Sequence, residues 1–317
     1  MPRDEVVLRN DCWRVVVLPG TGASLAYGKI RMPDGAWRNL LRPTPASRSA
    51  DPAHCASYVL VPFSNRVRDG VLRFEGETFQ LRRHVGDRNA MHGTGMEFAW
   101  DVVAASDRAV TLALETNDLV GANFPWSFRA EVTYALDGSR LTIGTRLTNT
   151  DTVRFPAGFG HHPFFQRGIR SPSVSEVRVQ IPATGAYPMV NSIPVAPAQP
   201  PSADLDFRTL RALDRTFLND CYTRSGNEPV RLEWPESGVR VAIRSDEVFA
   251  HTLLYAPRRR PYFAVEPVTN ANDGFNLMAE GVPGHGVFVL EPGQTRSGDI
   301  EIEVEVGVDP GSAAPAP

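Results

Sequence analysis

Apolar and polar side chains alternate along this chain with a period of two residues. The clearest example is GDIEIEVEVGV near the C-terminus, where Ile300, Ile302 and Val304 alternate with glutamates. A strand that buries one face and exposes the other produces this alternation. Such a pattern predicts a predominantly antiparallel fold of at least a dozen strands. Short runs of the same kind recur at 15–18, 140–149, 174–181 and 239–244.

Turn residues divide these runs and leave little room for helices. Asp-Gly pairs stand at 69–70 and 137–138, and a Pro-Gly pair stands at 292–293. Together with 26 Gly and 27 Pro spread along the chain, they favour short strands over long helices. Segment 201–218 is the best candidate for one or two helical turns. The predicted fold class is therefore all-β, a large antiparallel β-sandwich.

The chain shows no repeat of fixed period and no linker that would divide it. We therefore expect a single domain over residues 1–308, followed by a disordered tail at 309–317 with the sequence DPGSAAPAP. The proline-rich stretch around 194–202 is typical of an extended surface loop.

Composition and charge then exclude several classes of protein. The 317 residues are 42% apolar with a formal net charge of −3, which gives no reason to expect a nucleic acid or an anionic membrane as partner. Cys12, Cys55 and Cys221 are odd in number and lack CxxC spacing, so neither a disulfide framework nor a zinc site is indicated. No signal peptide or membrane span is evident in the sequence, and we expect a cytoplasmic protein.

Two polar segments do not fit a simple sandwich. In VPFSNRVRDG at 61–70, Asn65 and Arg66 follow an apolar run, although a strand that ends in a solvated turn would look the same. In NAMHGTG at 89–95, flanking glycines permit a tight loop that presents His92. This histidine is equally well explained as a structural residue or as a ligand contact.

Two further segments carry candidate proton-transfer groups. In AGFGHHPFFQ at 157–166, Pro163 restricts His162 to an extended conformation beside an aromatic pair. In PYFAVEPVTNANDGFN at 261–276, Glu266 interrupts an apolar run. The alternation puts Glu266 on the same face as Tyr262, so it is either outward-facing or half-buried with a raised proton affinity.

Together these groups match the needs of sugar ring opening, in which the anomeric hydroxyl loses a proton and the ring oxygen gains one. One carboxylate base and one histidine acid suffice, while a second histidine and an arginine can hold hydroxyls. No cofactor is needed. A metal site is not expected either, because the adjacent His161 and His162 on a strand would point to opposite faces.

The order of these motifs resembles the aldose 1-epimerase (galactose mutarotase-like) family over nearly the whole chain. The resemblance implies the supersandwich fold of that family, a small-molecule sugar substrate and no cofactor; we expect a monomer or a homodimer. It rests on RVVVLPGTGASL, the PF-x-NR stretch at 62–66, the His-Gly pair at 92–93, FPWSF at 124–128, HPFF at 162–165 and VEPVTNANDGFN.

Carried over residue by residue, the resemblance makes Glu266 the general base toward the C1 hydroxyl and His162 the general acid toward the ring oxygen. It makes Arg66 and His92 substrate binders, with Asn65 beside them. The family also binds hydroxyls with an aspartate shortly before an aromatic residue. Here the spacing to Tyr222 selects Asn219 and the chemistry selects Asp220, which we favour. All these groups should converge on one open cleft lined by aromatics such as Phe164 or Trp126.

Two departures from the family pattern leave the substrate open. Gln166-Arg167 stands where galactose-specific members have Asn-Leu, and EPVT replaces their usual Glu-x-Gln, so galactose itself need not be the substrate. A hexose-6-phosphate 1-epimerase would need a basic pocket, for which Arg82-Arg83 and the run 258–260 are candidates. A non-catalytic carbohydrate-binding sandwich is the alternative from another class, and the presence of both an acid and a base counts against it.

Overall fold

The structure is a computed structural model that describes residues 5–171, 176–214, 216–224 and 226–307. The predicted disordered tail at 309–317 lies outside these residues, as does the start of the chain. Within them the fold is built almost wholly of antiparallel strands with one short helix, which confirms the predicted fold class. No helix in the described part is long and apolar enough to cross a membrane.

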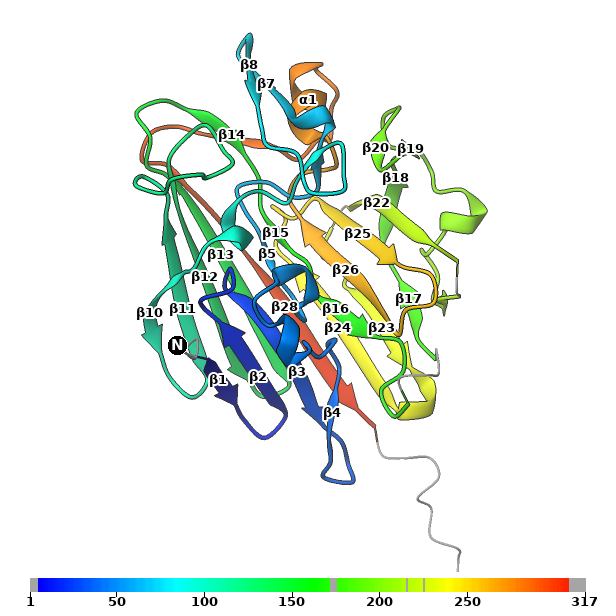
Figure 1. Ribbon diagram of the computed structural model, residues 1–317. Helices are drawn as coiled ribbons and strands as arrows, with labels where there is room; N and C mark the ends of the chain where they lie inside the picture. The colour runs from blue at the N-terminus through cyan, green and yellow to red at the C-terminus, as the bar shows by residue number, and fades with distance from the viewer. Residues whose placement is uncertain (1–4, 172–175, 215, 225, 308–317) are drawn as a thin grey trace, which may run out of the picture.

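Two large sheets form the body of the molecule, and a smaller sheet of N-terminal strands accompanies them (Figure 1). The nine-stranded sheet has the order β10(Asp101–Ala105), β11(Ala109–Glu115), β12(Phe128–Asp137), β13(Arg140–Asn149), β28(Thr295–Val306), β24(Val239–Ser245), β23(Val230–Trp234), β17(Arg178–Gln180), β21(Arg211–Ala212). The seven-stranded sheet has the order β18(Ala183–Ala186), β22(Leu218–Arg224), β25(His251–Ala256), β26(Tyr262–Val268), β15(Gly160–His161), β5(Val59–Leu60), with β16(Phe164–Gln166) beside β26. The four-stranded sheet is β1(Val6–Arg9), β2(Trp13–Leu18), β3(Ser24–Arg31), β4(Trp37–Asn39).

Short hairpins and pairs complete the fold at the upper end of Figure 1. The remaining pairs are β14(Phe155–Ala157) with β27(Phe288–Leu290), β19(Met189–Val190) with β20(Ile193–Pro194), β6(Arg66–Val67) with β9(Ala90–Met91), and β7(Val71–Phe74) with β8(Glu77–Gln80). The helix α1(Gly274–Ala279) contacts β7 and follows β26 in the chain.

The alternation seen in the sequence corresponds to the two faces of each strand. Ile300 and Ile302 of β28 join one buried cluster with Phe263 and Val265 of β26, so the two large sheets share a core. Burying such side chains stabilises the fold by about 1.5–3 kcal/mol each. The other face of β26, with Ala264 and Val268, belongs to a second buried cluster on the outer side of the seven-stranded sheet.

The structure contains the predicted turns but not the predicted helix. Gly138 has φ +54 in a two-residue turn between β12 and β13, and Gly293 has φ +76 at the predicted Pro-Gly turn. The helical prediction for 201–218 was largely wrong, because among the described residues of this segment only Ala203–Leu205 forms a 3₁₀ turn, and the chain then enters β21 and the start of β22. Leu218 is buried as a residue of β22, and Phe207, which lies between the 3₁₀ turn and β21, is buried in the same core.

His161 is a core residue and gives a testable pH dependence. Its Nε2 lies 2.8 Å from Thr145 Oγ1 of the facing sheet, and burial lowers the pKa of the His161 imidazole to about 3. Below pH 6.5 the unfolded chain therefore takes up a proton that the folded protein does not, so stability falls as the pH falls. The loss is about 1.4 kcal/mol per pH unit between pH 6.5 and 3.

We therefore expect the melting temperature to fall between pH 7 and pH 5. In His161→Asn the melting temperature should fall less, because the free energy of unfolding should lose roughly 2 kcal/mol less over that interval. Differential scanning calorimetry across this range measures both slopes. The exposed Val195, which does not titrate, serves as the control, and Val195→Ala should keep the wild-type slope. An unchanged slope in His161→Asn would contradict the assignment.

Candidate active site

A cavity of about 270 Å³ lies on the outer face of the seven-stranded sheet, away from the shared core. All the predicted site residues except Asp220 line it, although they come from segments scattered over 200 residues of the chain. The full lining is Arg42, Ala53, Tyr58, Asn65, Arg66, His84, Met91, His92, Met96, His162, Phe164, Asn219, Tyr255, Tyr262 and Glu266.

Glu266 and His162 touch each other in this cavity. His162 Nε2 lies 3.0 Å from Glu266 Oε1, and the two side chains are 7% and 2% exposed. Glu266 extends from the outer face of β26, between Ala264 and Val268, as the alternation required. Its second oxygen, Oε2, has no hydrogen-bond partner among the described residues. A buried carboxylate with a free acceptor is ready to receive a hydroxyl group.

Aromatic rings hold the His162 imidazole on both sides. Tyr58 stacks on it with ring centroids 4.6 Å apart, and Phe164 packs against it at 4.4 Å. Burial and then the nearby Glu266 carboxylate raise the pKa of Tyr58 well above its usual range. Tyr58 is therefore neutral at physiological pH, and it can position the imidazole without adding a charge.

Asn65 and His92 both adopt left-handed backbone conformations, with φ +56 and +64. Such conformations cost about 1–3 kcal/mol each and persist only where neighbours enforce them. One enforcing contact joins the two residues, since the His92 amide donates to the Asn65 carbonyl at 2.8 Å. A Cβ on Gly93 would lie 2.1 Å from the Val61 carbonyl oxygen, so only glycine fits after His92.

The segment after Glu266 holds the loop that carries Asn65 and Arg66. The Ser64 amide donates to Asn270 Oδ1 at 3.0 Å, and the Asp273 amide donates to the Arg66 carbonyl at 2.7 Å. The conspicuous polar run after Glu266 therefore positions the opposite wall of the cavity, and it does so through buried hydrogen bonds.

Arg66 and His92 provide polar groups on that wall. Arg66 Nε donates to Asp87 at 2.9 Å, and its side chain remains 18% exposed. Burial, and then the neighbouring His162 and Arg66 side chains, lower the pKa of His92 well below its ordinary value. His92 is thus neutral and can either donate to or accept from a hydroxyl group.

The structure places Asn219, and not Asp220, in this cavity. Successive side chains of a strand point to opposite faces, so the two neighbours on β22 cannot both reach it. Asp220 lies on the face of Leu218 and Tyr222 and lines a different cavity. Burial raises the pKa of Asp220. The spacing argument from Tyr222 therefore agrees with the geometry, whereas the preference for a carboxylate does not.

Other predictions about the surroundings of the site had mixed outcomes. Phe164 lines the cavity as expected, but Trp126 packs instead among Phe124, Phe155 and Phe79 in a separate aromatic cluster. Trp126 belongs to the FPWSF segment that carries part of the resemblance, but neither that segment nor its residue type indicates which surface the ring covers.

Several lining residues were not predicted. The Arg42 guanidinium lies 3.7 Å from the centre of the Phe164 ring and 4.6 Å from that of Tyr262, and it donates to the carbonyls of Ala53 and Cys55. Arg42 therefore stabilises the aromatic wall of the cavity by cation–π contacts, and its guanidinium is largely occupied by protein partners. The alternation had already put Tyr262 on the face of Glu266, but Arg42 and Tyr58 lie in irregular segments whose direction has no sequence signal.

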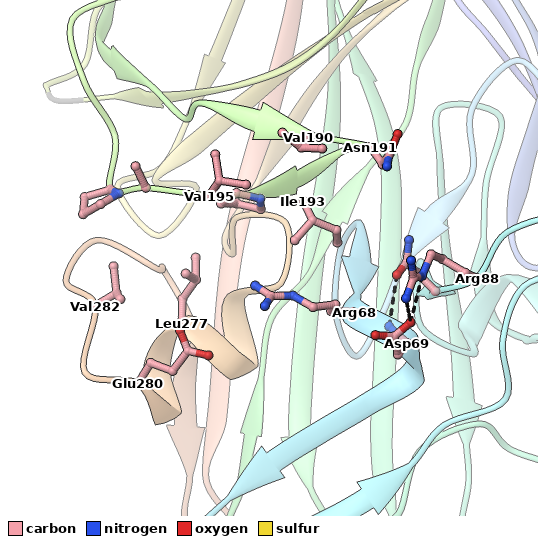
Figure 2. Close-up of a pocket in the computed structure, with 14 residues that line it drawn as sticks. Arg68, Asp69, Arg88, Val190, Asn191, Ile193, Val195, Leu277, Glu280 and Val282 are labelled. Atoms are coloured by element: carbon pink, nitrogen blue, oxygen red, sulfur yellow. Dashed lines mark hydrogen bonds and ion pairs between the residues drawn. The ribbon is translucent and has the colours of Figure 1, made fainter.

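A larger cavity, about 540 Å³, lies beyond the far end of the β6–β9 pair. Figure 2 shows Arg68 reaching between Ile193 of β20 and Leu277 of α1, while Arg88 pairs with Asp69 at another wall. Unlike the first cavity, its described lining contains no histidine, and its cations already have acidic partners. Nor do the described residues contain any group of three or more His, Cys, Asp or Glu placed to hold a metal ion.

Comparison with known proteins gives one consistent result. The model of the family named aldose 1-epimerase matches residues 4–303. The chain is 27% identical to the Escherichia coli K12 protein YphB over 315 residues, which cover 89% of this chain and 98% of YphB. It is 28% identical over 222 residues to an Escherichia coli K12 protein named aldose 1-epimerase, covering 68% of this chain and 63% of that protein.

Solved structures agree in fold. The crystal structure of a galactose mutarotase-like protein from Clostridium acetobutylicum superposes with a TM-score of 0.82 at 16% identity, over 95% of each chain. At this identity the likeness shows a shared fold, which is the galactose mutarotase-like sandwich expected above.

Proposed function

Because the chain belongs to the aldose 1-epimerase family, we propose that it interconverts the α and β anomers of a free aldose. The observation that carries this proposal is the contact between Glu266 and His162 inside a cavity lined by hydroxyl-binding groups. A protein that only binds sugar has no need to bury a carboxylate against a histidine, because burying such groups is costly.

The proposed reaction begins with the sugar across this pair. Glu266 takes the proton of the C1 hydroxyl, and His162 Nε2 gives a proton to the ring oxygen. The bond between C1 and the ring oxygen breaks, the C1–O double bond forms, and the open-chain aldehyde results. Closure on the other face of C1 reverses both proton transfers and restores both groups. Both oxygens are attached to C1, so an acid and a base that lie side by side suit this step.

The remaining lining residues hold the rest of the sugar. Arg66, His92 and Asn219 can hydrogen-bond hydroxyls, and Asn65 Nδ2 is buried without a partner in the described structure. An unsatisfied buried donor costs about 1–3 kcal/mol, and a ligand that pairs with it recovers part of that cost.

The phosphate-dependent alternative receives less support from the structure. Arg82 pairs with Glu97 and Arg83 donates to the Asp69 carbonyl, and neither lines the cavity. The run 258–260 forms the exposed turn between β25 and β26, also outside the lining. A free sugar is therefore the substrate we propose.

Anomer exchange measured by NMR or polarimetry over a panel of free and phosphorylated aldoses tests the proposal. We expect exchange above the spontaneous rate for at least one free aldose. If no aldose of either kind were exchanged faster than in buffer, the binding-module alternative would replace this proposal.

Arg66→Ala should raise KM by about ten- to a hundredfold while kcat changes little. A hydrogen bond from a charged group is worth about 1.5–3 kcal/mol, and Arg66 would hold hydroxyls equally in the ground state and the transition state. Arg88→Ala is the matched control, because Arg88 pairs with Asp69 in the other cavity. A fall in kcat at constant KM would instead place Arg66 among the groups that act in the transition state.

A further inference from the structure

The proposed acid, His162, has a hydrogen-bond partner at only one of its two ring nitrogens. Its Nε2 lies 3.0 Å from Glu266 Oε1, whereas Nδ1 is buried and has no partner among the described residues. In histidines that transfer protons, a hydrogen bond at one nitrogen commonly fixes the ring while the other nitrogen acts. A sugar that lies across Glu266 and His162 would also loosen their contact, so other groups have to orient the imidazole during the reaction.

Two aromatic rings pack against this imidazole. Between ring centroids, Tyr58 and Phe164 lie 4.6 and 4.4 Å from His162 and 6.2 Å from each other, so the three residues form one ring cluster. Main-chain bonds bring them together, since the His162 amide donates to the Tyr58 carbonyl at 3.0 Å and the Phe164 amide donates to the Ala56 carbonyl at 2.8 Å. The orientation of His162 therefore depends on where the other two rings are held.

Arg42 contacts the ring cluster from two directions. Its guanidinium lies 3.7 Å from the centre of the Phe164 ring, and its amide donates to the Phe164 carbonyl at 2.8 Å. The same guanidinium donates to the carbonyls of Ala53 and Cys55, in the segment that leads to Tyr58. A planar guanidinium can stack on a ring and donate in its own plane at the same time, and a lysine ammonium cannot. Arg42 is 8% exposed, so these contacts are shielded from water.

We propose that Arg42 is a positioning residue for the general acid. It holds Phe164 and the segment before Tyr58 so that these rings turn His162 Nε2 toward the ring oxygen of the sugar, in place of a hydrogen bond at Nδ1. This inference rests on the proposed function, because it concerns the proton donor of the same reaction. Arg42 then affects the rate of ring opening and not the binding of the sugar, although it lines the cavity.

Arg42→Met should lower kcat about ten- to a hundredfold with little change in KM, since misplacing a catalytic group by about 1 Å can cost about a hundredfold in rate. Arg42→Lys keeps the charge but loses the planar face, and should also lose most of kcat. Arg14→Met is the matched control, because the exposed Arg14 stacks on Trp37 at 4.3 Å and lies outside the cavity lining. Melting curves give the folded fraction of each variant, and Arg42→Lys carries the test if Arg42→Met does not fold.

A double-mutant cycle separates a role through His162 from a general structural role. In a His162→Asn background, Arg42→Met should cause no further loss of kcat, because the group that it positions is absent. The enzyme concentration is raised in this background to keep exchange above the spontaneous rate.

NMR of the histidine rings gives a readout that does not depend on turnover. The chain has seven histidines, and the ring-proton signals of His162 are identified by their loss in His162→Asn. These protons lie beside the faces of Tyr58 and Phe164 and carry the ring-current shifts of both. Their signals should therefore move in Arg42→Met and Arg42→Lys and stay in place in Arg14→Met.

The outcomes separate the two proposals. If the wild-type protein exchanges an aldose but the folded Arg42 variants keep its kcat, or only raise KM, the positioning role is overturned and the epimerase proposal stands. The same holds if Arg42→Lys has the wild-type kcat, if Arg42→Met lowers kcat by the same factor with and without His162, or if the His162 signals do not move. If the wild-type protein exchanges no aldose, both proposals fail.

Discussion

Glu266→Gln should lower kcat for anomer exchange by about 10²–10⁴-fold, with a much smaller change in KM. General acid and base catalysis by a positioned side chain is typically worth this much. Glutamine keeps the shape of the side chain and its hydrogen bonds but cannot accept the C1 proton at neutral pH. The effect therefore falls on the transition state and not on ground-state binding.

Stability has to be measured alongside this rate, because Glu266 is 2% exposed and contacts His162. Breaking a buried pair by removing one partner can cost about 3–5 kcal/mol, and partial unfolding would also reduce the apparent kcat. A melting curve and the fraction of folded enzyme correct for this. Glu280→Gln, an exposed carboxylate in the cavity of Figure 2, is the matched control. A folded Glu266→Gln enzyme with the wild-type kcat for every sugar would remove the proposed base.

His162→Asn is expected to lower kcat by a similar factor of about 10²–10⁴, because the ring oxygen would lose its proton donor. Single-turnover anomer exchange isolates this chemical step from sugar release. If the acid and the base act in one concerted ring opening, the double variant with Glu266→Gln should lose less than the product of the two single losses.

His161→Asn is the informative comparison for His162, since the two residues are neighbours that face opposite sides of the sheet. His161 bonds to Thr145 in the core, so its replacement should affect melting temperature and leave kcat of the folded enzyme near that of the wild type. Equal losses of kcat in both variants would indicate that His162 acts only through the packing of strand β15 and its surroundings.

The alternation of apolar and polar residues carried most of the information about the fold. It predicted strands such as β13 and β28 and put Glu266 on the same face as Tyr262, because burying one face of a strand constrains every second residue. The hydrogen bonds from Asn270 and Asp273, which bring Asn65 and Arg66 to Glu266, involve residues about 200 positions apart, and no local pattern reports such pairing.

The residues that were wrongly predicted or missed lie where the sequence carries no reliable signal for side-chain direction. Asp220 was preferred for its charge, but a shift of one residue along a strand reverses the face, and Asn219 is the residue on the side of the site. Tyr58 and Arg42 reach the site from segments without regular alternation. The short helix α1 begins at Gly274 after Asp273, which has φ +57 and no side-chain cap bond, so it carried no recognisable start signal.

The contact between Glu266 and His162 also determines whether the enzyme or the sugar has to move during the proposed reaction. Groups 3.0 Å apart can serve only one corner of a sugar ring, so one pair must act on both anomers. The newly formed aldehyde then exchanges its two faces by turning about its own C1–C2 bond while the distant hydroxyls stay held. The enzyme would thus act on both anomers because the sugar rotates about its own C1–C2 bond, while the protein does not rearrange. An open-chain analogue locked against this rotation should remain bound without being converted.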